Sequence, residues 1–365
     1  MAMNLLKMAK TNEVKFDLAN YVILLRGEAK SGKTTFYSQV VKELYNDTSK
    51  GLLIPFEKGY SAIQGVNVFP ETIIPSMVIN GQPMTGWKVF TEIVDEVCQL
   101  KGEDKINIVC IDTVDEFLKV AEAEVCKLSR IKTKKPCESV DSAFGGFARG
   151  KKYLANMVKE QIEKLRNANV GIVFIGHTKI KTLKTKIEEQ EYNILGSSLT
   201  EDYDRIFAND ADFILMITQE NHIHNGVMTK GERFLRFRGD GFYNAGSRFH
   251  NVPEKIQLSA RGFVDTLKKA VMEINEVKDV VEYETKVEAE FKASEEVAVK
   301  SQEEIKSLVD NMVERIKAFI EDPSVPAMRK QEFKEACLSR ELNLREPYSN
   351  EVTAFQEVCG QFGLV

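Results

Sequence analysis

The sequence lacks any run of about 20 apolar residues, the length that a membrane-spanning helix needs. Its first residues, MAMNLLKMAKTNEVKF, contain no continuous apolar segment followed by a cleavage site, so we expect no secretory signal. Cysteine is scarce, and the 6 cysteines form no CxxC pair. The 4 histidines show no metal-ligand spacing. We therefore expect free thiols, no membrane partner and a reducing, cytoplasmic location.

Charge is distributed unevenly along the chain. Of the 365 residues, 43% are hydrophobic and 29% charged, which suffices for one sizeable core and an appendage. Residues 271–322 carry 15 acidic and 7 basic side chains, which leaves 43 basic and 40 acidic side chains elsewhere. The acidic stretch contains no proline or glycine up to Glu321, which favours an exposed helix or tether. We predict a core over 1–268, an acidic helical linker over 269–303 and a small helical C-terminal domain over 304–365.

Apolar strands alternate with helical segments between residues 20 and 265. This arrangement predicts an α/β fold with a mostly parallel central sheet flanked by helices. The helical period is clearest in 151–167, where apolar residues share one face. The predicted strands are Val22–Arg26, Leu52–Phe56, Ile106–Ile111, Gly171–Ile175, Asp212–Thr218 and Arg233–Arg238. Ligands of such sheets bind at the carboxyl ends of the strands, so we expect the functional residues there.

The segment VILLRGEAKSGKTT has the spacing of a phosphate-binding P-loop, between an apolar strand and a helix predicted over Thr35–Leu44. Backbone N–H groups of the loop and the helix N-terminus would surround phosphate oxygens. Lys33 would reach the β- and γ-phosphates, and Thr34 would bind Mg²⁺. The residues expected to hold ATP are Gly27, Glu28, Ala29, Lys30, Ser31, Gly32, Lys33, Thr34 and Thr35.

Two carboxylates follow predicted strands. Asp112 ends the apolar segment INIVCID. In P-loop proteins a carboxylate at the end of such a strand holds Mg²⁺ through water, and we predict this role for Asp112. The alternative is an aspartate that caps the following helix. Glu57 ends GLLIPFE and is the candidate base that activates the attacking water, the alternative being a surface glutamate beside Lys58. We expect Asp115 and Glu116, one helical turn after Asp112, to belong to a solvated face.

His177 follows the apolar run GIVFIG and precedes the basic segment TKIKTLKTK. A polar side chain at this strand end can sense the γ-phosphate and pass the signal into the following loop, which would make His177 part of the catalytic group. The alternative is a structural histidine.

These residues together resemble the RecA-type ATPase core. More closely, the segments GEAKSGKTTF, IDTVDEF, FGGFARG, GHTK and AGSRF resemble phage-encoded RecA-like nucleotide-binding proteins, including single-strand annealing proteins of the Sak-four type. The resemblance covers about residues 18–265, and His177 stands where RecA has glutamine. It implies a RecA-like P-loop ATPase that acts on single-stranded DNA in phage recombination, as a ring or filament in the host cytoplasm.

Two basic segments suit sequence-independent contacts to DNA phosphates. KLSRIKTKKP supplies Lys132, Lys134 and Lys135, and HTKIKTLKTK supplies Lys179, Lys181, Lys184 and Lys186. We predict both as loops, and the second adjoins His177, so nucleotide state would order or release it. A lysine-rich loop that is only solvated surface is the alternative.

Arg248 is the candidate for a residue that acts across a subunit boundary. It follows the flexible NAG in GERFLRFRGDGFYNAGSRFH, whereas Arg236 and Arg238 share one face of a strand. The resemblance implies an assembly in which a neighbour closes the nucleotide site, where the guanidinium stabilises charge on the γ-phosphate. The alternative is a salt bridge, for instance to Asp240.

A second function remains open: an ATP-driven switch or assembly factor that acts on protein partners without DNA. The acidic linker and C-terminal helices would then carry the function. In the DNA reading, a single-strand binding protein is a candidate partner of the C-terminal region. A small-molecule kinase is disfavoured, because the sequence offers no arginine-rich lid segment.

Overall fold

The computed structural model describes residues 14–184, 191–221, 223–224, 227–228, 231–276, 306–340, 342–344, 347 and 352–364. The chain divides into two compact units, Met1–Val277 and Lys278–Val365. The predicted boundary at residue 268 falls inside helix α6 (Ala260–Ile274), whose Ala270 and Val271 are buried. The first unit therefore continues through this helix. Most of the predicted acidic linker, residues 277–303, lies outside the described residues.

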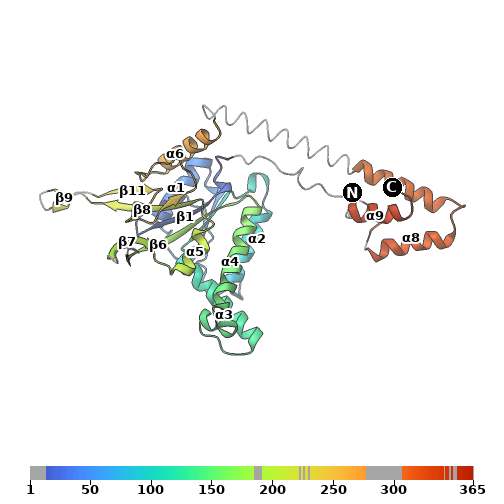
Figure 1. Cartoon of the computed structure of the whole chain (residues 1–365), viewed down its shortest axis with the longest axis horizontal. Coiled ribbons are helices and arrows are strands. Elements are labelled where there is room, and N and C mark those ends of the chain that lie inside the picture. Colours follow the sequence, from blue (N-terminus) through green and yellow to red (C-terminus); the bar gives the residue numbers. More distant parts are fainter. Residues whose placement is uncertain are drawn as a thin grey trace. The chain divides into compact units, whose positions relative to one another are not determined.

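A nine-stranded sheet forms the centre of the first unit (Figure 1). Its strand order is β13–β11–β8–β1–β6–β5–β2, with β12 paired to β8 and β7 to β6. The parallel strands are β1 (Val22–Gly27), β2 (Gly51–Pro55), β5 (Ile108–Asp112), β6 (Gly171–Lys184) and β8 (Phe213–Glu220). The antiparallel pairs involve β7 (Glu191–Ser197), β11 (Glu232–Arg236), β12 (Gly246–Ser247) and β13 (Lys255–Gln257). All six predicted strands are confirmed as strands.

Helices cover both faces of this sheet (Figure 1). Helix α1 (Lys33–Tyr45) and α6 pack together on one face, where the rings of Phe36 and Phe263 lie 5.8 Å apart. The other face is covered by α2 (Gly86–Gln99), α3 (Val114–Thr133), α4 (Arg149–Asn167) and α5 (Glu201–Ala208). The predicted α/β fold with helices on both sides of a mostly parallel sheet is confirmed.

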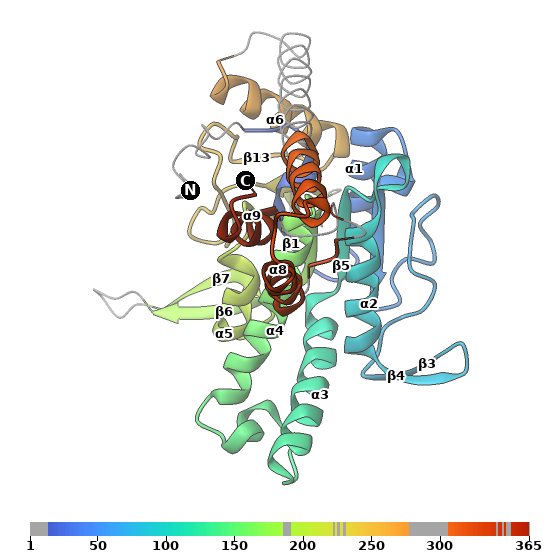
Figure 2. The same ribbon diagram turned by 90° about the vertical axis from the view of Figure 1, so that its right-hand side faces the viewer.

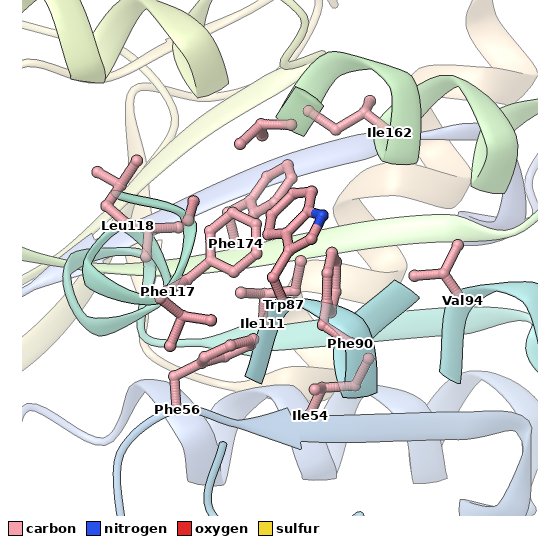
Figure 3. Packing of buried hydrophobic residues seen from close by; sticks show 14 of the residues in the cluster. Ile54, Phe56, Trp87, Phe90, Val94, Ile111, Phe117, Leu118, Ile162 and Phe174 are labelled. Carbon is pink, nitrogen blue, oxygen red and sulfur yellow. The ribbon is translucent and has the colours of Figure 1, made fainter. Parts of the chain in front are cut away.

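An aromatic cluster supports the strand ends that carry the candidate carboxylates (Figure 3). The ring of Phe117, in the first turns of α3, lies 5.0 Å from the rings of both Phe56 and Phe90. Trp87 lies 5.9 Å from the same ring. Phe56 directly precedes Glu57, so its burial fixes the backbone from which that glutamate projects.

Both basic segments that were predicted as loops have regular structure instead. The segment 178–184 belongs to β6, which continues beyond the last β1 pair, Gly27 with His177, and forms a two-stranded ribbon with β7. Lys186 lies outside the described residues. The first segment is mostly helix, because α3 continues to Thr133 and only Lys134 and Lys135 of the predicted lysines follow it. Successive side chains of a strand point to opposite faces, so a segment with a lysine at every second or third position can form a strand that has one polar face.

Helices α3 and α4 run side by side and are joined by the short helix η5 (Val140–Gly145) (Figure 2). Other short elements were not predicted. They are β3 (Ser76–Ile79), β4 (Gln82–Thr85), β9 (Ile223–His224), β10 (Val227–Met228), η2 (Leu18–Asn20), η3 (Thr48–Lys50) and η4 (Gly102–Asp104).

The second unit is helical. Residues 306–321, α8 (Ala327–Ser339) and α9 (Val352–Gln361) form helices around their own buried cluster, which includes Met312, Phe333 and Phe355. In the described part of the chain, no helix has the length and apolar character to cross a bilayer.

Candidate nucleotide site

The loop between β1 and α1 is tightly wound and needs its glycines. A Cβ atom on Gly27 would lie 2.6 Å from the Ser31 hydroxyl oxygen and 3.2 Å from the Ile217 carbonyl oxygen. Gly32, the N-cap of α1, has a φ of 97°, a conformation that L residues rarely adopt. The Ser31 hydroxyl is buried without a hydrogen-bond partner among the described residues. This close-packed turn at a helix N-terminus fits a phosphate group.

Lys33 lies inside the loop rather than in solvent. Its side chain is 6% exposed, and its Nζ donates to the carbonyl oxygens of Gly27 and Glu28 at 2.9 Å each. Burial lowers the pKa of the Lys33 ammonium, and the nearby carboxylates, chiefly Asp112 and Glu57, counteract this shift. The ammonium is thus positioned where the phosphates of a nucleotide in this loop would lie.

Thr34 and Asp112 come together at the edge of the loop. The Thr34 hydroxyl donates to Asp112 Oδ2 at 2.7 Å. Burial raises the pKa of Asp112, and the bond from Thr34 and the charge of Lys33 oppose this. Thr113, not Asp112, is the N-cap of α3, so the capping alternative does not apply. A hydroxyl and a carboxylate oxygen side by side fit Mg²⁺, which prefers oxygen ligands.

Glu57 and His177 meet beside this pair. Glu57 Oε2 lies 3.3 Å from His177 Nε2 and 3.5 Å from the hydroxyl oxygen of Thr113, which donates to it. The Glu57 carboxylate remains 49% exposed, so water has access to it. The backbone N–H of Glu57 donates to the Asp112 carbonyl at 3.1 Å. Three strand ends therefore bring Glu57, Asp112 and His177 to one place.

Asp115 is a further member of this group, contrary to the prediction of a solvated face. Its Oδ2 accepts from the backbone N–H of His177 at 3.2 Å, and its Oδ1 accepts from the Ser198 hydroxyl. Asp115 thus connects the start of the β6–β7 ribbon to the residue after its end. Glu116, in contrast, pairs with Lys119 at the surface, at 2.6 Å.

Arg233 also reaches the loop, which the sequence analysis did not foresee. It lies on β11, and its Nη1 is 3.4 Å from the Ser31 carbonyl oxygen. A cavity of about 100 Å³ opens here. Its lining comprises Glu28, Ala29, Lys30, Ser31, Leu195, Ile217, Thr218, Gln219 and Arg233. The only sequence signal was the predicted strand itself, which did not indicate which residue faces the loop.

Arg248 lies at the amino-terminal end of the parallel strands, away from the loop at their carboxyl ends. It follows β12, which pairs with the beginning of β8, and its Nη1 is 3.0 Å from Asp212 Oδ1. The salt-bridge partner is therefore Asp212, and Asp240 instead pairs with Arg236 at 3.2 Å. Arg248 is 55% exposed and does not reach the loop of its own chain.

The lysines predicted for DNA contact have different surroundings. Lys181 donates to the Leu199 carbonyl at 2.9 Å, and Lys184 pairs with Glu191 at 3.4 Å. Lys179 is exposed and makes no ion pair with a described residue. Lys132 lies over the Phe144 ring, 6.0 Å from its centroid, while Lys134 and Lys135 are exposed.

A parallel sheet that presents a glycine-rich phosphate loop beside a Thr34–Asp112 pair defines a P-loop nucleotide-binding domain. Within that class, the chain belongs to the AAA_24 family, an AAA domain, which matches residues 19–249.

The proteins similar to the chain include a prophage-derived protein and a solved archaeal structure. The SPbeta prophage-derived uncharacterized protein YorG of Bacillus subtilis (strain 168) is 27% identical over 162 residues, which are 44% of this chain and 42% of YorG. The chain thus matches less than half of that relative. The KaiC-like protein PH0186 of Pyrococcus horikoshii OT3 has a TM-score of 0.31 at 11% identity, over 60% of this chain and 77% of that structure.

Proposed function

We propose that this protein is an Mg²⁺-dependent ATPase that acts on single-stranded DNA in phage recombination or replication, as an annealing or recombinase-type protein. The observation that carries the ATPase part is the convergence of five side chains where four strands, β1, β2, β5 and β6, leave the parallel part of the sheet. These side chains are Lys33, Thr34, Glu57, Asp112 and His177. Thr34 donates to Asp112 at 2.7 Å, the backbone N–H of Glu57 donates to the Asp112 carbonyl at 3.1 Å, and Glu57 lies 3.3 Å from His177, while Lys33 directly precedes Thr34.

In the proposed reaction, Glu57 takes a proton from a water molecule that attacks the γ-phosphorus. The bond between this phosphorus and the β–γ bridging oxygen breaks, and ADP and phosphate leave. Lys33 holds the β- and γ-phosphates, and His177 orients Glu57 through the contact at 3.3 Å. Mg²⁺ bound by Thr34 and Asp112 would neutralise charge on the phosphates.

The β6–β7 ribbon supports the DNA part of the proposal. It begins directly after His177, and Asp115 ties both of its ends to the catalytic group. By the alternation of strand residues, Lys179 shares one face of the ribbon with Tyr192, which is 39% exposed, and Ile180, which is 70% exposed, lies on the other face. A cation and an exposed ring on one face suit a strand with both phosphates and unpaired bases. The similarity to a prophage-derived protein agrees with a phage role.

DNA binding is tested by fluorescence anisotropy of a labelled oligodeoxythymidylate with the full chain, over a range of salt concentrations and with an ATP analogue. We expect affinity to fall as salt rises, and Lys179→Ala to flatten this dependence by about 0.7 in the log–log slope. Lys88→Ala on α2 is the control, because it removes the same charge far from the ribbon. If no salt-dependent binding is found, the switch that acts on protein partners becomes the better account.

Replacing Arg233 with alanine is expected to weaken ATP binding by about 10-fold or more, since a charge-assisted hydrogen bond to phosphate is worth roughly 1.5–3 kcal/mol. The guanidinium has only to move from the Ser31 carbonyl to the nucleotide. Isothermal titration measures the change, with Arg261→Ala, an exposed arginine of α6, as the control. Unchanged affinity in Arg233→Ala would show that this side chain does not touch the nucleotide.

We further propose that Arg248 completes the site of a neighbouring subunit in a ring or filament. Arg248 lies at the amino-terminal end of the parallel strands, whereas the nucleotide loop of the same chain lies at their carboxyl ends. Arg248 can therefore contact ATP only in a neighbouring subunit that is arranged head to tail with its own. Arg248→Ala and Lys33→Ala subunits should each be inactive, and their mixture should regain part of the rate at shared interfaces. A fully active Arg248→Ala protein, or a dead mixture whose subunits demonstrably co-assemble, would contradict this role.

A further inference from the structure

A second cavity lies away from the nucleotide loop, between the end of α3, η5 and the beginning of α4. Its volume is about 430 Å³, within the range of about 300–1,000 Å³ that is common for small-ligand pockets. Aromatic, basic and amide side chains line it. They include Lys132, Phe144, Arg149, Lys152, Tyr153 and Asn156.

The cavity has an aromatic wall. The rings of Phe144 and Tyr153 lie 4.9 Å apart at an angle of 44°, and Tyr153 is 41% exposed. Phe144 comes from η5 and Tyr153 from α4, so only the fold brings them together. A flat ring exposed in an open cavity is a surface on which another planar group can stack.

The charge around the cavity is positive. Lys132, Arg149 and Lys152 all line it, and none of them forms an ion pair within the described part of the chain. The neighbouring Lys151 differs, because it pairs with Asp141 at 3.2 Å and Asp202 at 3.7 Å. Three cations without carboxylate partners favour an anionic ligand. The Asn156 amide adds a donor and an acceptor.

The backbone from the end of η5 to the beginning of α4, which carries Phe144, adopts a strained conformation. Phe144, Phe147 and Ala148 have φ values of 53°, 55° and 58°, which non-glycine residues rarely adopt. The Phe144 N–H donates to the Ser129 hydroxyl at 2.9 Å, and Arg149 donates to the Phe144 carbonyl at 3.3 Å. These bonds anchor the Phe144 backbone on both sides, so its ring is positioned before any ligand binds.

We propose that this cavity binds an unpaired base of single-stranded DNA, which stacks on Tyr153 and Phe144 while Lys132, Arg149 and Lys152 contact the flanking phosphates. The proposal rests on the proposed function and adds a base-binding pocket to it. Helix α3 starts directly after Asp112 and the ribbon starts directly after His177, whereas the cavity lies at the far end of α3, about 30 Å along its 20 residues. A strand that contacts both must therefore span several nucleotides.

The experiment compares two labelled strands of equal length in anisotropy titrations with the full chain: oligodeoxythymidylate and an abasic strand with the same number of phosphates. Wild type should bind the thymidylate at least about 10-fold more tightly, since one base–aromatic stack is worth this much. Tyr153→Ala should lose about 10-fold of this preference while binding the abasic strand as wild type does, and Tyr153→Phe should keep it. Lys152→Ala should weaken both strands equally. Lys159→Ala, on the same helix but outside the cavity, should weaken neither.

The outcomes separate the two proposals. If wild type binds neither strand, the proposed action on DNA fails and the pocket fails with it. If wild type binds DNA but Tyr153→Ala keeps its preference for thymidylate, DNA binding stands and the pocket assignment is overturned. Thermal melting of each variant shows whether it is folded. Should Tyr153→Ala not fold, the thymidylate preference retained by Tyr153→Phe and the equal loss on both strands in Lys152→Ala still test the proposal.

Discussion

Glu57→Gln is expected to bind ATP as wild type does but to hydrolyse it at least about 100-fold more slowly. Glutamine keeps the shape of the side chain and a hydrogen bond to His177, whereas it cannot take the proton from the attacking water. Loss of a general base costs about 10²–10⁴-fold. The position supports this assignment, because Glu57 is half exposed beside Asp112 and lies 3.3 Å from His177.

The matched control for this variant is Glu116→Gln, which removes a carboxylate that pairs with Lys119 on the surface of α3. Single-turnover phosphate release measures the chemical step, and isothermal titration with an ATP analogue measures binding. If Glu57→Gln turns over normally and Glu116→Gln does not, the base has been assigned to the wrong residue. A loss of binding in Glu57→Gln would instead indicate a structural role for Glu57.

Lys33→Ala should weaken ATP binding by at least about 100-fold. Two or more charge-assisted hydrogen bonds to phosphate are lost at once, each worth roughly 1.5–3 kcal/mol. Lys33 is the buried lysine of the loop, and its Nζ already bonds two loop carbonyls at 2.9 Å, so no other described cation occupies its place. Isothermal titration with ATP and Mg²⁺ measures the affinity.

Lys42→Ala is the control for Lys33→Ala, because Lys42 is an exposed lysine in the last turn of the same helix. It should bind ATP as wild type does. Circular dichroism separates a loss of affinity from a loss of fold, since Lys33 is buried. ATP affinity that survives in a folded Lys33→Ala protein would contradict the assignment of the loop.

Much of the fold could be predicted because buried parallel strands are continuous apolar runs, and the sequence contains five of them. The positions of Glu57, Asp112 and His177 followed from the rule that such sheets bind ligands at their carboxyl ends. The loop, the strands and the carboxylates are local patterns, and local patterns can be read from a sequence.

The contacts that were missed join distant segments. Asp115 bonds His177 and Ser198, which lie 62 and 83 residues away, and no spacing indicates this. The β6–β7 ribbon depends on a strand pairing that its lysine-rich sequence obscured. The cavity at Phe144 and Tyr153 requires a strained turn that no propensity favours. Only the strand pairing shows that Arg233 lies near the carboxyl end of β8, beside the loop, and that Arg248 lies near the beginning of β8, away from it.

The most direct test of the whole account is the rate of phosphate release from ATP by the full chain in Mg²⁺, measured with and without oligodeoxythymidylate. We expect hydrolysis in the wild-type protein, a higher rate when the strand is added, and neither in Glu57→Gln. Hydrolysis that does not respond to the strand, in a protein that also shows no salt-dependent DNA binding, would contradict action on DNA and favour the switch with protein partners. No hydrolysis under either condition would contradict the central claim.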